Sequence, residues 1–375
     1  MDMSNYPVVN IAQLEELVID AALMPRPRPT LVLSPPGSGK TETAARLAAR
    51  LGLAFVPFEL GLTVPEEVGG IPARDPQTGA LVRFPLGPIR HACEHPSLLL
   101  IDEVTRADAT RQGAAMTGIN ERRWGDNFLH PRTVVMLAGN EPDSGGVFSL
   151  LDALLNRCCV VKLRTERSEI QNYLRGNVAG GANARIEIPA DYLQRYEAMR
   201  VQLATLWADY SEGRAEMIAE SPPAGFAESG ALWPSGRAVV HATERIASRI
   251  ARGQASNDLV ALAHASGTVG REIGMMWQRL NDMAQKLPSV AEINANPKTA
   301  QVPPDVESAI ASLGMLPQIA PGALWQYLNR YPDSMLEIKA AAYRRNMNRT
   351  PPLTDTESTK IYTAFSSKLL KAIRH

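Results

Sequence analysis

Short hydrophobic runs, separated by polar and glycine-rich segments, mark the first half of the chain. They predict buried strands at residues 30–33, 54–58, 98–101 and 134–138. A fifth run, residues 158–163, follows a short helical segment, and the alanine-rich residues 41–51 predict a helix after the first strand. Strands that alternate with helices indicate an α/β fold with a parallel five-stranded sheet covered on both faces.

The second half of the chain shows helical spacing. It predicts helices at residues 170–174, 192–207, 238–250 and 259–280, with proline-rich boundaries near Ser221 and Ala300. One more helix, residues 11–23, precedes the first strand. We therefore expect an α/β domain at residues 1–165, an α-helical domain at 166–300 and a helical C-terminal extension at 301–375.

Composition narrows the class of protein. The chain is 45% hydrophobic and 21% charged, and no apolar run approaches the roughly 20 residues that span a bilayer. Residues 1–10 lack the basic start and apolar centre of a secretory signal. We therefore expect a cytoplasmic protein without a membrane span, in which Cys93, Cys158 and Cys159 stay reduced.

Charge bears on the partner. Lys and Arg number 39, and Asp and Glu number 39, so the chain lacks the net positive field that drives non-specific binding to nucleic acid. This balance disfavours nucleic acid as a partner without excluding it.

A glycine-rich segment, SPPGSGKT at residues 34–41, joins the first predicted strand to its helix. Backbone N–H groups of such a loop, together with a helix N-terminus, cradle phosphates. Lys40 would reach the outer phosphates and Thr41 would ligate Mg²⁺. Ser34 replaces the first glycine of the pattern, at an edge that tolerates a small side chain. The alternative is a glycine-rich turn with a chance Lys-Thr pair. The predicted nucleotide-binding residues of the loop are Pro36, Gly37, Ser38, Gly39, Lys40 and Thr41.

Two carboxylates follow the buried run at residues 98–101. Asp102 would order the Mg²⁺ shell, and Glu103 would orient or deprotonate the attacking water. The alternative is a pair of acids that cap a helix, but packing gives a buried strand no reason to end in two carboxylates. Together with the loop, the pair predicts an ATPase that uses ATP and Mg²⁺.

Residues 31–163 resemble the MoxR branch of AAA+ ATPases. The motifs that carry the resemblance are the loop SPPGSGKT, EEVGG at residues 66–70, TGALVRFPLGPI at 78–89, LLLIDEVTRA at 98–107, INERRW at 119–124, VVMLAGNEPDSGG at 134–146 and LLDALLNRC at 150–158. Departures from the pattern are Ser34 for glycine, Thr105 for asparagine and Cys158 for an aromatic residue. None of them removes a catalytic group. The resemblance implies a P-loop AAA+ core, a helical lid and the C-terminal extension.

The resemblance also implies three further site residues. Asn140 is similar to the sensor 1 residue beside the γ-phosphate, and Arg157 to the arginine finger that enters the neighbouring subunit's site. Arg237, in WPSGRA at residues 233–238, looks like the sensor 2 residue, which reaches the phosphates from the lid. The alternatives are an asparagine in a turn, a cation at a helix C-terminus and a surface arginine at a helix start.

Two inserts, at residues 64–84 and 121–132, correspond to segments that face the pore or rim of a ring in this family. Arg122, Arg123 and Trp124 beside residues 125–127 predict a basic, aromatic hairpin tip that could grip a polypeptide or a nucleic-acid strand. The alternative is a solvated turn.

These observations predict a homo-oligomeric ring, a hexamer, that hydrolyses ATP at subunit interfaces. In the leading hypothesis it remodels a protein client in the manner of a chaperone, and the resemblance implies a partner with a von Willebrand factor A domain. One rival is a nucleic-acid motor or clamp-loader-like ATPase. Another is a nucleotide switch without turnover, which would need neither Glu103, Asn140 nor Arg157.

Overall fold

The computed structural model describes residues 6–141, 148–175, 185–210, 235–254, 287–313, 315–346 and residue 363. The chain divides into two compact units, the first formed by Met1–Arg200 with Arg214–Met275 and the second by Val201–Gly213 with Met276–His375. The domain limits at residues 165 and 300 stay a prediction.

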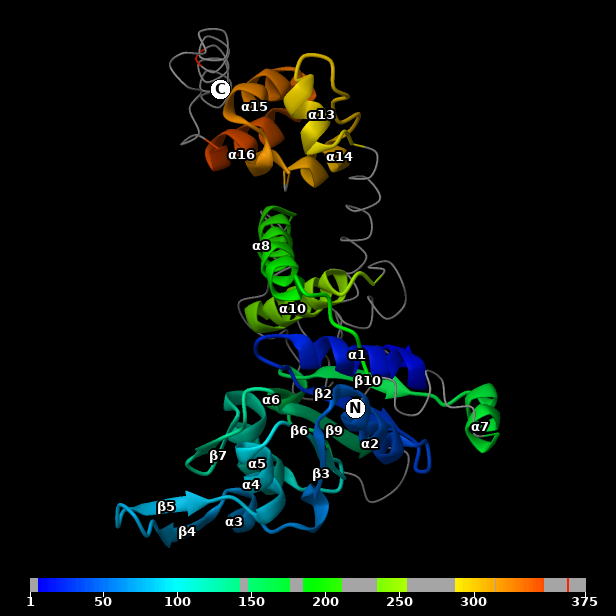
Figure 1. Ribbon diagram of the computed structural model, residues 1–375, viewed down its shortest axis with the longest axis vertical. Coiled ribbons are helices and arrows are strands. Elements are labelled where there is room, and N and C mark those ends of the chain that lie inside the picture. The colour runs from blue at the N-terminus through cyan, green and yellow to red at the C-terminus, as the bar shows by residue number, and fades with distance from the viewer. Residues whose placement is uncertain are drawn as a thin grey trace. The chain divides into compact units, whose positions relative to one another are not determined.

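A six-stranded parallel sheet forms the centre of the first unit (Figure 1). The strand order is β1-β10-β2-β9-β6-β3. The strands are β1 (Val8–Val9), β2 (Thr30–Ser34), β3 (Ala54–Glu59), β6 (Ser97–Asp102), β9 (Val134–Asn140) and β10 (Cys159–Leu163). The α/β fold and the parallel sheet are confirmed, but the predicted count of five strands is wrong. The sixth, β1, pairs Val8 with Lys162, and two residues are too few to leave a periodic pattern.

Both faces of the sheet are covered because alternate side chains of a strand point to opposite faces. On one face Leu100 and Val32 belong to a core shared with the helices α1 (Ile11–Leu23) and α2 (Lys40–Leu51). On the other face Leu99 and Leu31 belong to a core shared with α4 (Gly87–Glu94), α5 (Ala109–Glu121) and α6 (Asp152–Leu155).

The two inserts form hairpins that contact one another. The first insert follows the 3₁₀ helix η1 (Leu60–Leu62) and begins with the short helix α3 (Pro65–Val68). Its hairpin pairs β4 (Ile71–Arg74) with β5 (Leu81–Phe84). The second hairpin pairs β7 (Arg123–Trp124) with β8 (Asn127–Phe128). The backbone N–H of Arg83 donates to the Asp126 carboxylate over 2.6 Å, and Asp126 N–H donates to Arg83 O over 3.1 Å.

The prediction that Arg122, Arg123 and Trp124 form an exposed hairpin tip is wrong for Arg122 and Trp124, which are buried. Trp124 is 2% exposed, packs edge-on against Phe58 and donates its indole N–H to Val68 O. Arg122 is 9% exposed and donates to the carbonyls of His130 and Thr133. Both side chains therefore stabilise the base of the hairpin, and neither is available to a client.

Helices follow the sheet. The predicted helices at residues 170–174, 192–207 and 238–250 are found as α7 (Arg167–Leu174), α8 (Tyr192–Tyr210) and α10 (Gly236–Ala251). The predicted helix at 259–280 lies outside the described residues. Asp20, buried on α1, forms ion pairs with Arg249 and Arg252 and so ties α10 to the core domain.

The second unit contains short helices around their own core. They are α13 (Val290–Ala295), α14 (Val306–Ser312), η3 (Leu316–Gln318), α15 (Pro321–Asn329), η4 (Asp333–Met335) and α16 (Leu336–Asn346). Trp325 and Leu328 of α15 are fully buried in this core. Within the described ranges, no helix combines the length and the hydropathy that a membrane crossing requires.

Candidate functional site

The glycine-rich loop connects the carboxyl end of β2 to the first residue of α2. Gly37 and Gly39 have φ of +78° and +83°, a left-handed conformation that glycine adopts without strain. The turn thereby places the N-terminus of α2 directly after the strand. A cavity of about 600 Å³ opens there, lined by the loop together with Asp102, Glu103 and Asn140.

The sheet register brings the predicted phosphate-binding groups together. Ser34 at the end of β2 is paired with Asn140 at the end of β9. Lys40 Nζ donates to Ser34 Oγ over 2.8 Å and to Asn140 Oδ1 over 3.2 Å. Burial lowers the pKa of Lys40, while the nearby carboxylates of Asp102 and Glu103 oppose that shift. The Lys40 ammonium group therefore lies at the cavity, where it donates to Ser34 Oγ and Asn140 Oδ1. Phosphate oxygens would take the place of these two acceptors.

Thr41 and Asp102 fit a Mg²⁺ site. Thr41 Oγ1 donates to Asp102 Oδ2 over 3.2 Å across the cavity. Hydroxyl and carboxylate oxygens beside a phosphate are the hard ligands that Mg²⁺ takes in nucleotide sites.

Glu103 is held in a strained conformation at the end of β6. Its φ is +57°, which costs energy for a residue with a side chain. The Asp102 carboxylate accepts from Glu103 N–H over 2.8 Å, and Arg106 Nε lies 3.2 Å from Glu103 Oε2. Gly61 of η1 approaches so closely that a Cβ there would lie 3.3 Å from Glu103 Cβ. Surrounding contacts thus fix the carboxylate that lines the cavity.

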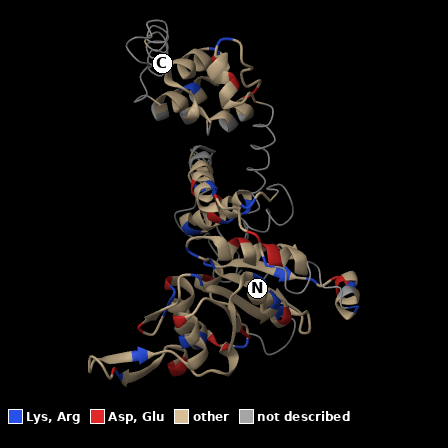
Figure 2. Ribbon diagram, viewed as in Figure 1, with Lys and Arg blue, Asp and Glu red and all other residues tan. Residues whose placement is uncertain are grey.

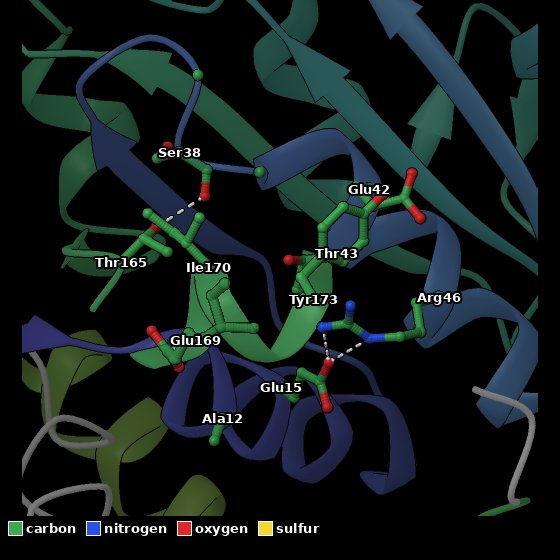
Figure 3. A pocket seen from close by; sticks show the side chains of 13 residues that line it. Ala12, Glu15, Ser38, Glu42, Thr43, Arg46, Thr165, Glu169, Ile170 and Tyr173 are labelled. Carbon is green, nitrogen blue, oxygen red and sulfur yellow. Dashed lines mark hydrogen bonds and ion pairs between the residues drawn. The ribbon is translucent and has the colours of Figure 1, made fainter. Parts of the chain in front are cut away.

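A second cavity, of about 360 Å³, shares Gly37, Ser38 and Gly39 with the first and is mainly apolar (Figure 3). Thr165 Oγ1 donates to Ser38 O over 2.9 Å at its edge, and Arg46 forms an ion pair with Glu15. Its size and its continuity with the loop suit the base and ribose of a nucleotide. The lining residues of other elements include Ile11 and Ala12 from α1, Thr43 from α2, and Ile170 and Tyr173 from α7.

Sequence reasoning missed this second cavity. Its walls come from three helices that are far apart in the chain, and no spacing within one helix marks them. In the structure, the large apolar side chains of Ile170 and Tyr173 on α7 line this cavity and remain exposed.

A third cavity, of about 300 Å³, is lined by arginines. Burial lowers the pKa of Arg157, and the neighbouring Arg237 lowers it further. The pKa of His241 falls to about 3, through burial first and then the surrounding arginines, so this imidazole is neutral at pH 7. The cavity therefore has a concentrated positive potential. Its charged and imidazole side chains are Arg26, Arg28, Glu121, Arg122, Arg157, Arg237 and His241.

The structure thus divides the predicted site residues between two places. Lys40, Thr41, Asp102, Glu103 and Asn140 line one cavity with the loop. Arg157 and Arg237 line the arginine cavity, which shares no lining residue with the first. Trp233 and Pro234, the start of the predicted sensor 2 segment, lie outside the described residues, as do residues 142–147.

Comparison with known proteins agrees with this geometry. Residues 29–158, which contain the loop, both carboxylates, Asn140 and Arg157, match the AAA domain of the dynein-related subfamily. The chain therefore carries an AAA+ core and is an ATPase that binds and hydrolyses ATP.

No curated protein matches the chain. The crystal structure of a "putative ATPase" from Cytophaga hutchinsonii is similar over 68% of this chain and 81% of that chain, with 16% identity and a TM-score of 0.45.

Proposed function

We propose that the protein is a MoxR-type AAA+ ATPase that works as a homo-oligomeric ring, a hexamer, in the cytoplasm. The observation that carries this proposal is the separation of the two cavities. Arg157 lines a cavity without any phosphate-loop residue, so its cation would serve the ATP of another subunit. Such an arginine is worth on the order of 10³ to 10⁵ in rate.

Within one subunit, each group has a defined task. Lys40 binds the outer phosphates, Thr41 and Asp102 hold Mg²⁺, and Glu103 activates the attacking water with help from Asn140. The bound Mg²⁺ would neutralise charge on the phosphates. The apolar cavity beside Tyr173 takes the adenine and excludes water from it.

Arg237 shares its cavity with Arg157, and Ser235 Oγ donates to Asn156 Oδ1 over 2.8 Å, which ties the start of α10 to the segment that carries Arg157. We therefore assign Arg237 to the neighbour's nucleotide as well, rather than to the phosphates of its own subunit.

The client is a protein in this proposal, and a von Willebrand factor A-domain protein is the partner that the resemblance suggests. The β4–β5 hairpin supplies an apolar surface for it, since Leu81 is 75% exposed and Ile71 is also exposed. Within the residues that the structure describes, two observations weigh against a nucleic-acid motor. Trp124 is buried, and Figure 2 shows acidic and basic residues interspersed along the described helices and strands.

A mixing experiment tests the shared site. Arg157→Ala subunits keep an intact Glu103 but offer no finger, and Glu103→Gln subunits keep the finger but cannot activate water. We call the first the acceptor and the second the donor. Each alone should be nearly inactive, and the mixture should regain ATPase activity at interfaces that combine both intact halves. Arg195→Ala is the control and should behave like the parent. It removes an exposed arginine of α8 that forms an ion pair with Asp191.

If the mixture stays as inactive as its components, although labelled subunits are shown to enter common rings, Arg157 does not complete a neighbouring site.

A further inference from the structure

Thr105 holds the backbone of Asn140. Its hydroxyl accepts from Asn140 N–H over 2.9 Å, and its side chain is 2% exposed. A Cβ at Gly139 would lie 2.8 Å from Thr105 Cγ2, so the methyl group of Thr105 also packs against β9. The hydroxyl thus helps to fix the backbone of Asn140, whose side-chain Oδ1 accepts from Lys40.

Gln112, on the helix α5 that follows Thr105, also holds a backbone segment through buried hydrogen bonds. It is 1% exposed, and both ends of its amide are used. Its Nε2 donates to Ala107 O over 2.9 Å and to Ser149 O over 3.1 Å, and its Oε1 accepts from Leu151 N–H over 2.9 Å. This one side chain thus fastens α5 to the backbone of residues 149–151.

Residues 149–151 lead directly into the segment that carries Arg157. Leu151 O accepts from the N–H groups of Leu154 and Leu155 in the first turn of α6. Arg157 Nη1 then donates to Ala153 O over 2.8 Å, so the finger leans back on the same helix. Phe148 N–H donates to Thr105 O over 2.6 Å and joins this segment to the residue that holds Asn140.

We propose that Thr105 and Gln112 are two positioning residues of one junction, in which Thr105 sets Asn140 in the subunit's own site and Gln112 sets Arg157 for the neighbour's site. The inference rests on the shared site proposed above. Thr105 and Gln112 are only seven positions apart in the sequence. The proposal nevertheless assigns Thr105 to the subunit's own site and Gln112 to the neighbouring subunit's site. The hydrogen bond from Phe148 N–H to Thr105 O places both residues in one junction.

Placing each substitution in the donor or in the acceptor subunit distinguishes these two roles. Thr105→Val keeps the shape and loses the hydroxyl, and Thr105→Ser keeps the hydroxyl. Gln112→Met keeps the length and loses all three hydrogen bonds. Gly113→Ala is the matched neighbour on α5, because a Cβ there meets nothing within 4 Å. Each substitution is placed first in the acceptor and then in the donor, and the regained ATPase activity is measured as kcat and KM.

Thr105→Val should lower the regained kcat only in the acceptor, and Gln112→Met only in the donor. Loss of a buried hydrogen bond of this kind corresponds to a decrease of about fivefold to tenfold. KM should change little, because neither residue lines the nucleotide cavity. Thr105→Ser should restore the acceptor, and Gly113→Ala should have no effect in either subunit.

A general loss of stability would reduce activity wherever the substitution is placed, so equal losses in both placements would overturn the proposal. Binding of a fluorescent ATP analogue and ring size confirm that each variant folds. Should the unsubstituted mixture fail to regain activity, the shared site itself is refuted. Should it regain activity while the placements do not differ, the shared site stands and the junction is wrong. Spatial connection alone does not establish coupling, which this crossed design measures.

Discussion

Replacement of Lys40 by alanine tests the phosphate site most directly. Lys40 Nζ donates to Ser34 Oγ and Asn140 Oδ1. The proposed phosphate role requires these two neutral acceptors to give way to phosphate oxygens when ATP binds. The substitution removes the loop's own cation but keeps Gly37 and Gly39, whose left-handed conformations shape the turn.

The expected loss follows from this exchange. A hydrogen bond to a charged group contributes about 1.5–3 kcal/mol, against about 1 kcal/mol for a neutral one. Two such exchanges amount to a net loss of about 1–4 kcal/mol in binding, so the Kd for ATP should rise between about fivefold and 1000-fold. Without nucleotide, the variant should melt near the parent temperature, because burial disfavours the charged form of Lys40 and its removal relieves that cost.

Calorimetric titration with Mg²⁺ and ATP measures the Kd, and melting with and without nucleotide measures stability. Lys162→Ala is the control, since Lys162 lies on β10 and lines none of the three cavities. The pH dependence gives a second signature. Protonated Lys40 should favour ATP, and burial holds its pKa below the ordinary 10.5, so the parent's affinity should fall as pH rises through that lowered pKa. The variant should lack this step.

A Kd within threefold of the parent's, in a variant that still folds, would refute the phosphate role of Lys40. A parent whose ATP affinity stays constant while Lys40 loses its proton would contradict the charge argument.

Three further outcomes are expected. Glu103→Gln should bind ATP, lose at least about 10²-fold in turnover and accumulate as a client-bound ring; a variant that binds ATP yet scatters light as a monomer would contradict ring assembly. Tyr173→Ala should weaken ATP up to about tenfold but leave tripolyphosphate binding unchanged, and equal losses would exclude a base-contacting role. Gly118→Ala should lower the free energy of unfolding by about 3 kcal/mol, because its Cβ would overlap the indole of Trp124, whereas Gly113→Ala on the same helix should not destabilise. Equal denaturation midpoints would disprove the clash.

The sequence was informative where the signal lies within one element. The run at residues 98–101 predicted β6 together with the carboxylates that end it, and the alanine-rich residues 41–51 predicted α2, which begins one residue earlier, at Lys40. The structure then placed Lys40, Asp102 and Asn140 around one cavity, because their strands are neighbours and parallel strands end at the same edge.

Contacts between distant elements could not be predicted in this way. Trp124 next to two arginines resembles an exposed tip, but Gly118 leaves room for its ring and Val68 supplies a carbonyl to its N–H. The walls of the second cavity, which Figure 3 shows, come from α1, α2 and α7. Likewise, the WPSGRA segment predicts an arginine at a helix start, and only the fold shows that Arg237 lies beside Arg157.

The departures at Ser34 and Thr105 meet at one hydrogen-bond network. Lys40 Nζ donates to Ser34 Oγ, the same ammonium donates to Asn140 Oδ1, and Asn140 N–H donates to Thr105 Oγ1. Both departures therefore supply a hydroxyl that accepts from a residue lining the loop cavity. Ser34 is fully buried and has no access to solvent, so its hydroxyl cannot be explained by hydration. Residues joined through shared partners do not act additively, so these two departures are best understood together, as one adjustment of how Lys40 and Asn140 are held before ATP arrives.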